Sequence, residues 1–230
     1  MSTIAITGAA RGIAFELVKG YQAEGARVYA FCRNMDSADA LKALAAKSNG
    51  LVTVHTMDVA SDESVRAGVK AIGDANIDML FNVAGVLGSV PPELEVGSSD
   101  WAMWQDVLNI MTLGPLRVLQ AFLPHMKAGS KVINLTSQLA ASTWPYGGLY
   151  PYAAAKAGLN RMMRSVAIDL KDRGIIVGIL HPGYVQTDMS GPSADITPEE
   201  SATAIRKVSA DWTLERSGDF LKWNGETHPW

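Results

Sequence analysis

The 230-residue sequence predicts a single α/β domain over residues 1–230, with a doubly wound sheet of about seven mainly parallel strands and helices on both faces. Short apolar, β-branched runs alternate with longer segments of helical periodicity, an order that favours right-handed βαβ units. The early runs are almost wholly apolar, as expected for strands covered on both faces. The length equals about one and a half average domains, and no internal repeat or linker divides it, so one large domain is expected.

The expected elements follow from these periodicities and from the residues at their ends. Strands are expected at 4–7, 27–32, 52–57, 79–83, 131–135, 176–180 and 220–223. Helices are expected at 12–25, 37–47, 61–73, 99–123, 152–173 and 197–210. Thr197 with Glu200 predicts a capping box, and Ser61 predicts another helix N-cap. Gly174 is expected to end the helix before the sixth strand, and Pro115 to kink or break the helix 99–123.

Composition and charge exclude several classes of protein. Apolar residues make up 48% and charged residues 19% of the chain, which allows a substantial core and excludes wholesale disorder. The formal net charge of −3 argues against a nucleic-acid partner, which requires a basic surface. The single cysteine, Cys32, cannot form an internal disulfide, which indicates a reducing compartment. The start lacks a signal-peptide pattern and no apolar run reaches about 18 residues, so we expect a cytoplasmic protein without a membrane partner.

A glycine-containing turn follows the first expected strand. Residues 7–14 read Thr-Gly-Ala-Ala-Arg-Gly-Ile-Ala. Gly8 and Gly12 at a strand-to-helix turn let the backbone approach a pyrophosphate, and the next helix offers free N–H groups and the positive end of its dipole. An ordinary glycine-rich turn is the alternative, because short glycine motifs are weak signals. The position in the first βα unit favours a dinucleotide site that includes Gly8, Arg11, Gly12 and Ile13.

This loop resembles that of the short-chain dehydrogenase/reductase family, which reads Thr-Gly-x-x-x-Gly-x-Gly. Ala14 stands where the third glycine belongs, a change that related dinucleotide-binding loops tolerate. The resemblance extends from Thr7 to the end of the chain. It implies a Rossmann-like fold and an enzyme that uses a nicotinamide dinucleotide.

The end of the second expected strand bears on the choice of cofactor. An NAD-preferring fold usually carries an acid here to bind the ribose 2′-hydroxyl, whereas this chain has Cys32 followed by Arg33. Arg33 and Arg11 are suited to bind a 2′-phosphate through charge-assisted bonds. The sequence therefore predicts NADP(H) in preference to NAD(H), with two solvated surface arginines as the alternative.

Three further segments, each just after an expected strand, resemble family motifs. Residues 58–59 resemble the adenine-contacting Asp-Val pair, and 82–85 resemble Asn-Asn-Ala-Gly with Val83 in place of the second Asn. Residues 182–187 resemble the segment that passes the nicotinamide. Sheets of this kind bind ligands at the carboxyl ends of their strands. The cofactor contacts implied here are Asp58, Val59, Asn82, Ala84, Gly85, Pro182, Gly183, Val185 and Thr187.

Tyr152 and Lys156 lie one helical turn apart, so the phenol and the ammonium share one face of an expected helix. A free tyrosine has a pKa of about 10, and a nearby cation should lower the pKa of the Tyr152 phenol. Tyr152 would then serve as general acid to a carbonyl or general base to an alcohol. Such a pair alone is common on helix surfaces, and the accompanying motifs make the chemical interpretation the favoured one.

The resemblance implies a site of four residues that transfers a proton. In it Tyr152 is the acid/base, and Lys156 lowers its pKa and binds the hydroxyls of the nicotinamide ribose. Ser137 holds the substrate oxygen. Asn109 holds a water molecule that links Lys156 to solvent.

Two alternatives stay open within this site. Tyr146 and Tyr150 are close in sequence to Tyr152, although neither has a lysine four residues later. Ser142 competes with Ser137 as the substrate-holding serine, because the gap from Ser137 to Tyr152 is slightly longer than is usual in the family. Ser137 is favoured because it stands at the end of an expected strand.

Segments 143–150 and 181–189, together with the C-terminal residues, resemble the family branch that contains C-factor (C-signal) and the sniffer-like carbonyl reductases. An apolar wall over the nicotinamide would be formed by Trp144, Tyr146, Leu149, Tyr150, Tyr184 and Met189, or else these residues pack their own loops. The expected substrate is an apolar or aromatic ketone or aldehyde of modest size, or the corresponding alcohol.

The expected function is NADP(H)-dependent transfer of a hydride between nicotinamide and a carbonyl/alcohol pair. The rivals are an NAD-dependent alcohol dehydrogenase and a dinucleotide-binding signalling protein with little turnover. Cys32 and the four histidines show no metal-ligand spacing, so no metal is expected. The resemblance also implies a homodimer or homotetramer that packs through helices 99–123 and 152–173.

Overall fold

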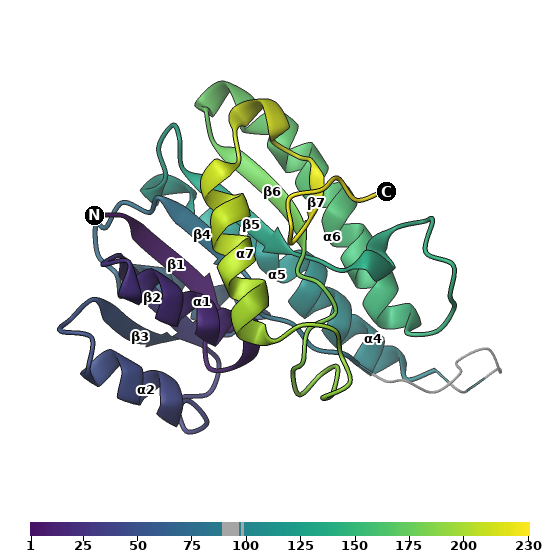
Figure 1. Cartoon of the computed structure of the whole chain (residues 1–230), viewed down its shortest axis with the longest axis horizontal. Coiled ribbons are helices and arrows are strands. Elements are labelled where there is room, and N and C mark those ends of the chain that lie inside the picture. The colour runs from purple at the N-terminus through teal and green to yellow at the C-terminus, as the bar shows by residue number, and fades with distance from the viewer. Residues whose placement is uncertain (89–96, 98) are drawn as a thin grey trace.

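The computed structural model describes residues 1–88, 97 and 99–230, and its centre is a seven-stranded sheet (Figure 1). The strands are β1 (Thr3–Thr7), β2 (Arg27–Cys32), β3 (Val52–Thr56), β4 (Met79–Asn82), β5 (Lys131–Leu135), β6 (Ile176–His181) and β7 (Phe220–Lys222). They lie in the order β3-β2-β1-β4-β5-β6-β7, and each neighbouring pair is parallel. The predicted doubly wound α/β sheet is confirmed. Its strand order reverses between β1 and β4, and such a switch point opens a ligand crevice at the carboxyl edge.

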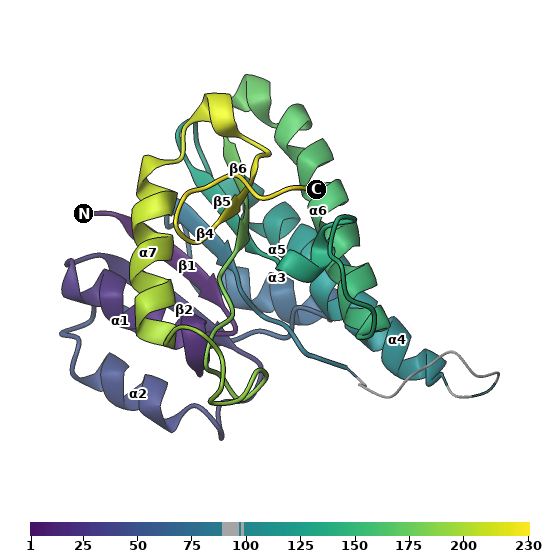
Figure 2. The ribbon, with the colours of Figure 1, turned by 45° about the vertical axis from the view of Figure 1, so that its right-hand side comes forward.

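Helices connect the strands and cover both faces of the sheet (Figures 1 and 2). The α-helices are α1 (Gly12–Ala23), α2 (Asp39–Ala46), α3 (Asp62–Lys70), α4 (Trp101–Leu108), α5 (Gly114–Phe122), α6 (Tyr150–Asp169) and α7 (Pro198–Asp211). Single turns of other geometry are the π-helical η1 (Asn109–Leu113) and the 3-10 helices η2 (Leu123–His125), η3 (Gln138–Ala140), η4 (Lys171–Arg173) and η5 (Leu214–Arg216). Helices α1, α2 and α7 pack on one face, and α3, α5 and α6 pack on the other.

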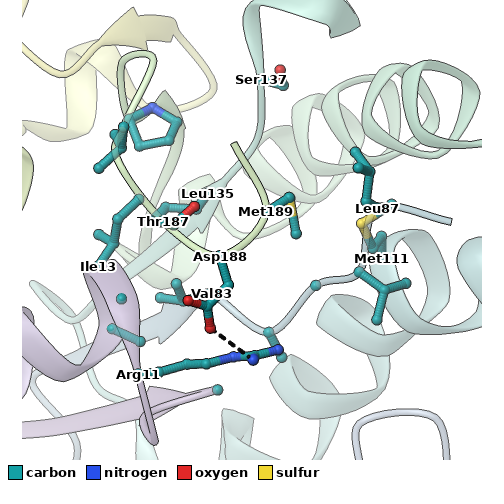
Figure 3. Close-up of a pocket in the computed structure, with 18 of the residues that line it drawn as sticks. Arg11, Ile13, Val83, Leu87, Met111, Leu135, Ser137, Thr187, Asp188 and Met189 are labelled. Atoms are coloured by element: carbon teal, nitrogen blue, oxygen red, sulfur yellow. Dashed lines mark hydrogen bonds and ion pairs between the residues drawn. The ribbon is translucent and has the colours of Figure 1, made fainter. Parts of the chain in front are cut away.

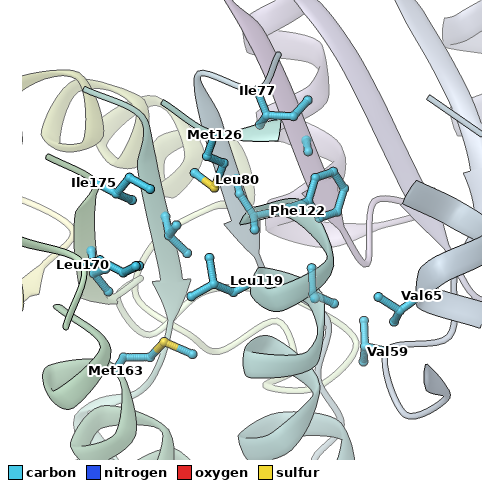
Figure 4. Close-up of a cluster of buried hydrophobic side chains, with 14 of the residues drawn as sticks. Val59, Val65, Ile77, Leu80, Leu119, Phe122, Met126, Met163, Leu170 and Ile175 are labelled. Carbon is cyan, nitrogen blue, oxygen red and sulfur yellow. The ribbon is translucent and has the colours of Figure 1, made fainter. Parts of the chain in front are cut away.

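Apolar side chains fill the space between the sheet and each layer of helices. On one face Leu80 of the sheet packs with Leu119 and Phe122 of α5 (Figure 4). On the other face Leu17 of α1 and Ile205 of α7 are fully buried. Each such side chain stabilises the fold by about 1.5–3 kcal/mol. This packing holds α1 and α6 in fixed positions at the carboxyl edge of the sheet.

Three of the predicted helix ends are confirmed. Thr197 Oγ1 accepts the N–H of Glu200 at 3.2 Å, and the Glu200 carboxylate accepts the N–H of Thr197 at 2.7 Å, which is the predicted capping box of α7. The hydroxyl of Ser61 accepts the N–H of Ser64 at the start of α3. Gly174 has a φ of +67° directly after η4, a conformation that glycine adopts without strain.

The expected helix 99–123 is interrupted close to Pro115, as predicted. Helix α4 gives way to η1 at Asn109, and α5 begins at Gly114. Proline has no N–H to donate inside a helix, and π-helical turns commonly absorb such a break. The wider turn changes the direction in which the side chains around it point, which matters for Asn109 and Met111 below.

The continuous helical run from Trp101 to His125 also bears on the expectation that no membrane helix exists. It spans 25 residues with a mean hydropathy of 1.3, so by length and composition alone it could cross a membrane. Its side chains Met111, Val118 and Phe122 are fully buried among the sheet and the neighbouring helices. Core helices of this kind satisfy the same two criteria, so the finding is weak support for a membrane span.

Candidate active site

A cavity of about 880 Å³ opens at the carboxyl edge of the sheet (Figure 3). Its walls come from the glycine loop, the strand ends after β2, β3, β4, β5 and β6, and the first turns of α6. Most of the residues predicted for cofactor binding and proton transfer line it, although they are scattered along the chain. These are Gly8, Arg11, Gly12, Ile13, Arg33, Asp58, Val59, Ala84, Gly85, Ser137, Tyr152, Lys156, Pro182, Gly183, Val185 and Thr187.

The glycine loop is tied to the turn after β4. The hydroxyl of Thr7 donates to the carbonyl of Phe81 and accepts the N–H groups of Val83 at 3.0 Å and Ala84 at 3.3 Å. Gly8 has a φ of +72°, and a Cβ there would lie 2.8 Å from the Cα of Ala84. Gly8 is therefore required by both its conformation and its close contact. The turn expected at 82–85 forms even though Val83 replaces an asparagine, because the backbone makes the bonds.

The start of α1 supplies a place for a phosphate group. Gly12 begins the helix with a φ of +58°, and no side chain caps the first turn. Gly12, Ile13 and Ala14 line the cavity, so this helix end faces it. Free N–H groups and the positive end of a helix dipole attract anions. The loop and the uncapped helix fit the pyrophosphate of a dinucleotide.

Two arginines reach the same cavity, and they differ in what they contact. Arg33 follows the buried Cys32 and is exposed, and within the described residues no ion pair or hydrogen bond engages its guanidinium. Arg11 Nη1 lies 2.9 Å from Asp188 Oδ2. Asp58, the other acid on the cavity wall, accepts the N–H of Ala60 at 2.9 Å.

Ser137, Tyr152 and Lys156 meet at the opposite end of the cavity. Ser137 lies two residues after β5 and caps η3, where its hydroxyl accepts the N–H of Leu139 at 3.2 Å. Its hydroxyl is also close enough to that of Tyr152 to lower the pKa of the phenol through a hydrogen bond. The Lys156 ammonium donates to the carbonyl of Leu135 at 2.8 Å and lies 5.9 Å from the centre of the Tyr152 ring.

The competing residues lie elsewhere. Ser142 is exposed and outside the cavity wall, and so is Tyr146. Tyr150 begins α6 but does not line the cavity. Of the alternatives left open by the sequence, the structure therefore brings only Ser137 and Tyr152 together with a lysine.

Burial controls the protonation of this site. Burial raises the pKa of Tyr152, because the phenolate is poorly solvated there, and the hydrogen bond with Ser137 opposes part of this rise. Burial also lowers the pKa of Lys156 to about 8. The expected lowering of the Tyr152 pKa by Lys156 is thus wrong in direction. The loss of water around the phenol outweighs the effect of a cation that already binds a carbonyl.

Residues 2–196 match the family model described as short chain dehydrogenase. The chain belongs to the short-chain dehydrogenase/reductase family. It is 34% identical over 237 residues to 1-hydroxy-2-glutathionyl-2-methyl-3-butene dehydrogenase of Rhodococcus sp. (strain AD45), a match that covers 100% of both chains. It is 37% identical over 171 residues to C-signal of Myxococcus xanthus, which covers 72% of this chain and 100% of the relative.

Solved structures show the same relationship. The NADPH-bound carbonyl reductase from chicken fatty liver superposes with a TM-score of 0.89 at 27% identity, covering 100% of this chain and 99% of that one. The carbonyl reductase Sniffer of D. melanogaster also gives 0.89 at 27% identity, with 100% of each chain covered. The expected resemblance to the branch of C-signal and the sniffer-like carbonyl reductases is therefore confirmed, and the chain is an oxidoreductase of this family.

Asn109, to which the family pattern gave a water-holding role, has a side chain that is bonded outside the cavity. Its side-chain amide donates to the carbonyl of Ala60 at 3.2 Å, and its oxygen accepts from Arg117 at 3.0 Å. It does not line the cavity, whereas Met111 does. The role of Asn109 in holding a water molecule stays a prediction.

Three further residues that were predicted to contact cofactor or substrate do not line the cavity. Asn82 does not line the cavity, because its amide is buried and donates to Asn134 at 2.9 Å. Trp144 and Tyr146 also lie outside it, and their rings pack on each other with centres 5.4 Å apart. Both rings lie in the loop of nine residues between η3 and α6, and the sequence there has no periodicity from which the path of the loop could be predicted.

Apolar side chains line part of the cavity. Tyr184 and Met189, two of the predicted substrate contacts, are among the lining residues. Leu87 and Met111, which the sequence analysis did not single out, also line it (Figure 3). Met111 is fully buried in a small cluster against which Tyr152 packs. The sequence did offer one sign that Leu87 lines the cavity, because Leu87 lies two residues after the Ala-Gly of the 82–85 turn.

His181 is a further cavity residue that sequence reasoning missed. It ends β6, and its Nδ1 accepts the N–H of Gln138, the residue after Ser137, at 3.2 Å. Burial lowers the pKa of His181 to about 3, and the neighbouring His228 and Lys222 add to the lowering. A neutral His181 therefore holds the loop that carries Ser137. Among the described residues, no group of three His, Cys, Asp or Glu side chains is placed to hold a metal ion.

Proposed function

We propose that the protein is an NADP(H)-dependent carbonyl reductase in which Tyr152 is the acid/base. The observation that carries the proposal is the convergence of Ser137, Tyr152 and Lys156 with the glycine loop on one cavity. Several solved relatives bind NADP, which supports the choice of cofactor. One is a carbonyl reductase from Pseudomonas aeruginosa PAO1 in complex with NADP, with a TM-score of 0.87 at 26% identity.

The chain offers a partner for each part of the dinucleotide. The N-terminus of α1 would hold the pyrophosphate, and Asp58 with Val59 would flank the adenine. Arg11 and Arg33 would bind the 2′-phosphate, and Lys156 the nicotinamide ribose. When bound, the dinucleotide supplies or accepts the hydride.

Proton transfer falls to the chain itself. Ser137 donates a hydrogen bond to the carbonyl oxygen of the substrate, and Tyr152 gives the same oxygen its proton. The raised pKa of Tyr152 keeps the phenol protonated at neutral pH, which is the form that reduction requires. Oxidation of an alcohol would need the phenolate.

The apolar wall limits the substrate. Leu87, Met111 and Met189 line the cavity, and Tyr152 packs against the cluster that holds Met111. Such a surface favours an apolar or aromatic ketone or aldehyde, because each apolar contact removes surface from water. Small polar aldehydes would leave this wall hydrated and bind weakly.

Substituting Tyr152→Phe tests the proposal. We expect the oxidation of NADPH with an aromatic ketone or aldehyde to slow by about 10²–10⁴-fold, because the proton donor is lost. Fluorescence titration should show that NADPH still binds, since the phenyl ring keeps its place in the wall. Tyr150→Phe is the matched control: it removes a hydroxyl from the same turn of α6 outside the cavity and should leave turnover unchanged. Full turnover by Tyr152→Phe would contradict the proposal.

The similarity to C-signal supports a second candidate, a dinucleotide-binding protein that acts through a partner. The same substitution distinguishes the two. A biological role that persists in Tyr152→Phe while reductase activity is lost would favour signalling.

A further inference from the structure

An ion pair joins the two rims of the cavity. Arg11 belongs to the glycine loop and Asp188 to the segment after β6, and Arg11 Nη1 lies 2.9 Å from Asp188 Oδ2 (Figure 3). Both side chains line the cavity, and they are 78% and 77% exposed. The pair therefore occupies the cavity mouth rather than the protein interior.

The pair places a carboxylate on the cation that the proposed function assigns to the 2′-phosphate. The guanidinium of Arg33, the other arginine on this wall, forms no ion pair or hydrogen bond within the part of the chain that the structure describes. The second acid on the wall, Asp58, already accepts the N–H of Ala60. Asp188 is thus the anion on the cavity wall that engages Arg11.

The two partners differ in how firmly they are held. Asp188 lies in a turn closed by the N–H groups of Ser190 and Gly191, which donate to the carbonyl of Thr187 at 3.1 and 2.8 Å. Arg11 precedes α1 and reaches Asp188 only through its long side chain. Rotation of that one side chain breaks the pair without moving the backbone.

We propose that Asp188 is a specificity-determining residue, which competes with the 2′-phosphate of the dinucleotide for Arg11. This inference rests on the proposed function. NADPH must displace the carboxylate before Arg11 binds its phosphate, whereas NADH leaves the ion pair intact. A phosphate monoester carries a charge of about −1.5 to −2 at neutral pH. An exposed ion pair contributes little to stability, so the 2′-phosphate displaces Asp188 from Arg11. Asp188 therefore weakens NADPH binding without preventing it.

The experiment is a titration of wild type and Asp188→Asn with NADPH and NADH by fluorescence. Adenosine 2′,5′-bisphosphate and 5′-AMP are titrated as fragments that differ only in the 2′-phosphate. We expect Asp188→Asn to bind NADPH and the bisphosphate about two- to fivefold more tightly, in line with the small worth of an exposed pair. The affinities for NADH and 5′-AMP should stay unchanged. High salt should reduce the gain, because both partners are exposed.

Two variants separate competition for Arg11 from a general effect of charge. Asp195→Asn removes the same charge from the same segment, where Asp195 is exposed and its carboxylate forms no ion pair with any described residue. This control should leave the four affinities as in wild type. In an Arg11→Ala background, Asp188→Asn should give no gain, because the shared cation is absent.

The possible failures point to different proposals. An equal gain for NADPH and NADH, the same gain in Asp195→Asn, or a gain that persists without Arg11 would overturn the competition and leave the proposed function standing. Failure of wild type to bind either dinucleotide or the bisphosphate would overturn both.

Discussion

His181 shows how a single buried side chain can link pH to the integrity of the site. Its Nδ1 accepts the N–H of Gln138 beside Ser137, and this bond needs an unprotonated nitrogen. The ring is 7% exposed and packs edge-on against His228, with Lys222 also adding positive charge nearby. Burial lowers the pKa of His181 to about 3, below the ordinary 6.5. Between pH 6.5 and about 3, the His181 imidazole therefore stays neutral in the folded state, whereas it takes up a proton in the unfolded chain.

The sign of the pH dependence follows from this difference. Above pH 6.5 the imidazole is neutral in both states, and between 6.5 and about 3 the unfolded chain binds more protons. The free energy of unfolding should therefore fall as the pH drops through this window, by about 2 kcal/mol at pH 5. His181→Asn keeps an acceptor and removes the titration. Urea unfolding of both proteins at pH 8 and pH 5 measures the difference, and an equal loss in both would contradict the prediction.

Tyr152 marks the limit of what residue types alone predict. Its spacing from Lys156 identified the pair correctly, because helix geometry determines which side chains share a face. The sign of its pKa shift depends on burial, which comes from the packing of α6 against the sheet and the loop before it. A spacing carries no information about that packing.

The interruption between α4 and α5 determines which side chain enters the site. Asn109 bonds Arg117 and the carbonyl of Ala60, and Arg117 donates to the carbonyl of Val59 at 2.6 Å. These bonds fasten the interrupted helix to the segment after β3, which holds Asp58 and Val59. Asn109 is thus placed to act on the adenine end of the cavity.

Asn109→Ala should therefore weaken binding rather than slow the chemistry. Loss of two hydrogen bonds should lower the free energy of unfolding by roughly 1–3 kcal/mol. The Kd for NADPH should rise a few fold, as residues 58–60 lose their support, while kcat at saturating NADPH stays within about threefold of wild type. Steady-state kinetics and fluorescence titration measure the two effects. A large fall in kcat with an unchanged Kd would return Asn109 to the proton-transfer site.

Helices and strands with a regular spacing of apolar residues were predicted well, whereas loops without such a spacing were not. The strands appear within a residue or two of their expected ends, since buried parallel strands leave uninterrupted apolar runs. Trp144 and Tyr146 lie in a loop with no period, and the structure turns them away from the cavity. The π-helical turn that begins at Asn109 alters the directions of the side chains that follow it, among them Met111, and only the position of Pro115 hinted at this.

At the scale of the whole molecule, the site is assembled by the order of the strands. Gly8, Ala84, Ser137 and His181 stand at or just after four different strand ends, and they line one cavity because β1, β4, β5 and β6 are neighbours. Parallel βαβ topology brings the carboxyl ends of the strands to one edge of the sheet, so the location of the cavity could be predicted from the sequence. The Arg11–Asp188 pair joins residues 177 positions apart at that same edge, and no local pattern announces it.

The helices beside the site leave apolar surface that a second copy of the chain would cover. Trp101 of α4, Leu113 of η1 and Ile168 of α6 are 66%, 50% and 63% exposed. Large apolar side chains at the surface are typical of interfaces when they lie on neighbouring elements. We therefore propose that the protein forms a homodimer or homotetramer through these helices.

Substituting Ile168→Glu should shift the assembly toward monomer, because burying an unpaired carboxylate at an interface is costly. Sedimentation of wild type and variant at micromolar concentration measures the shift. Ala43→Glu is the control, since it adds the same charge to an exposed site on α2, across the sheet from α6. It should leave the assembly unchanged. A wild type that sediments as a monomer would contradict the prediction and leave these apolar side chains facing solvent.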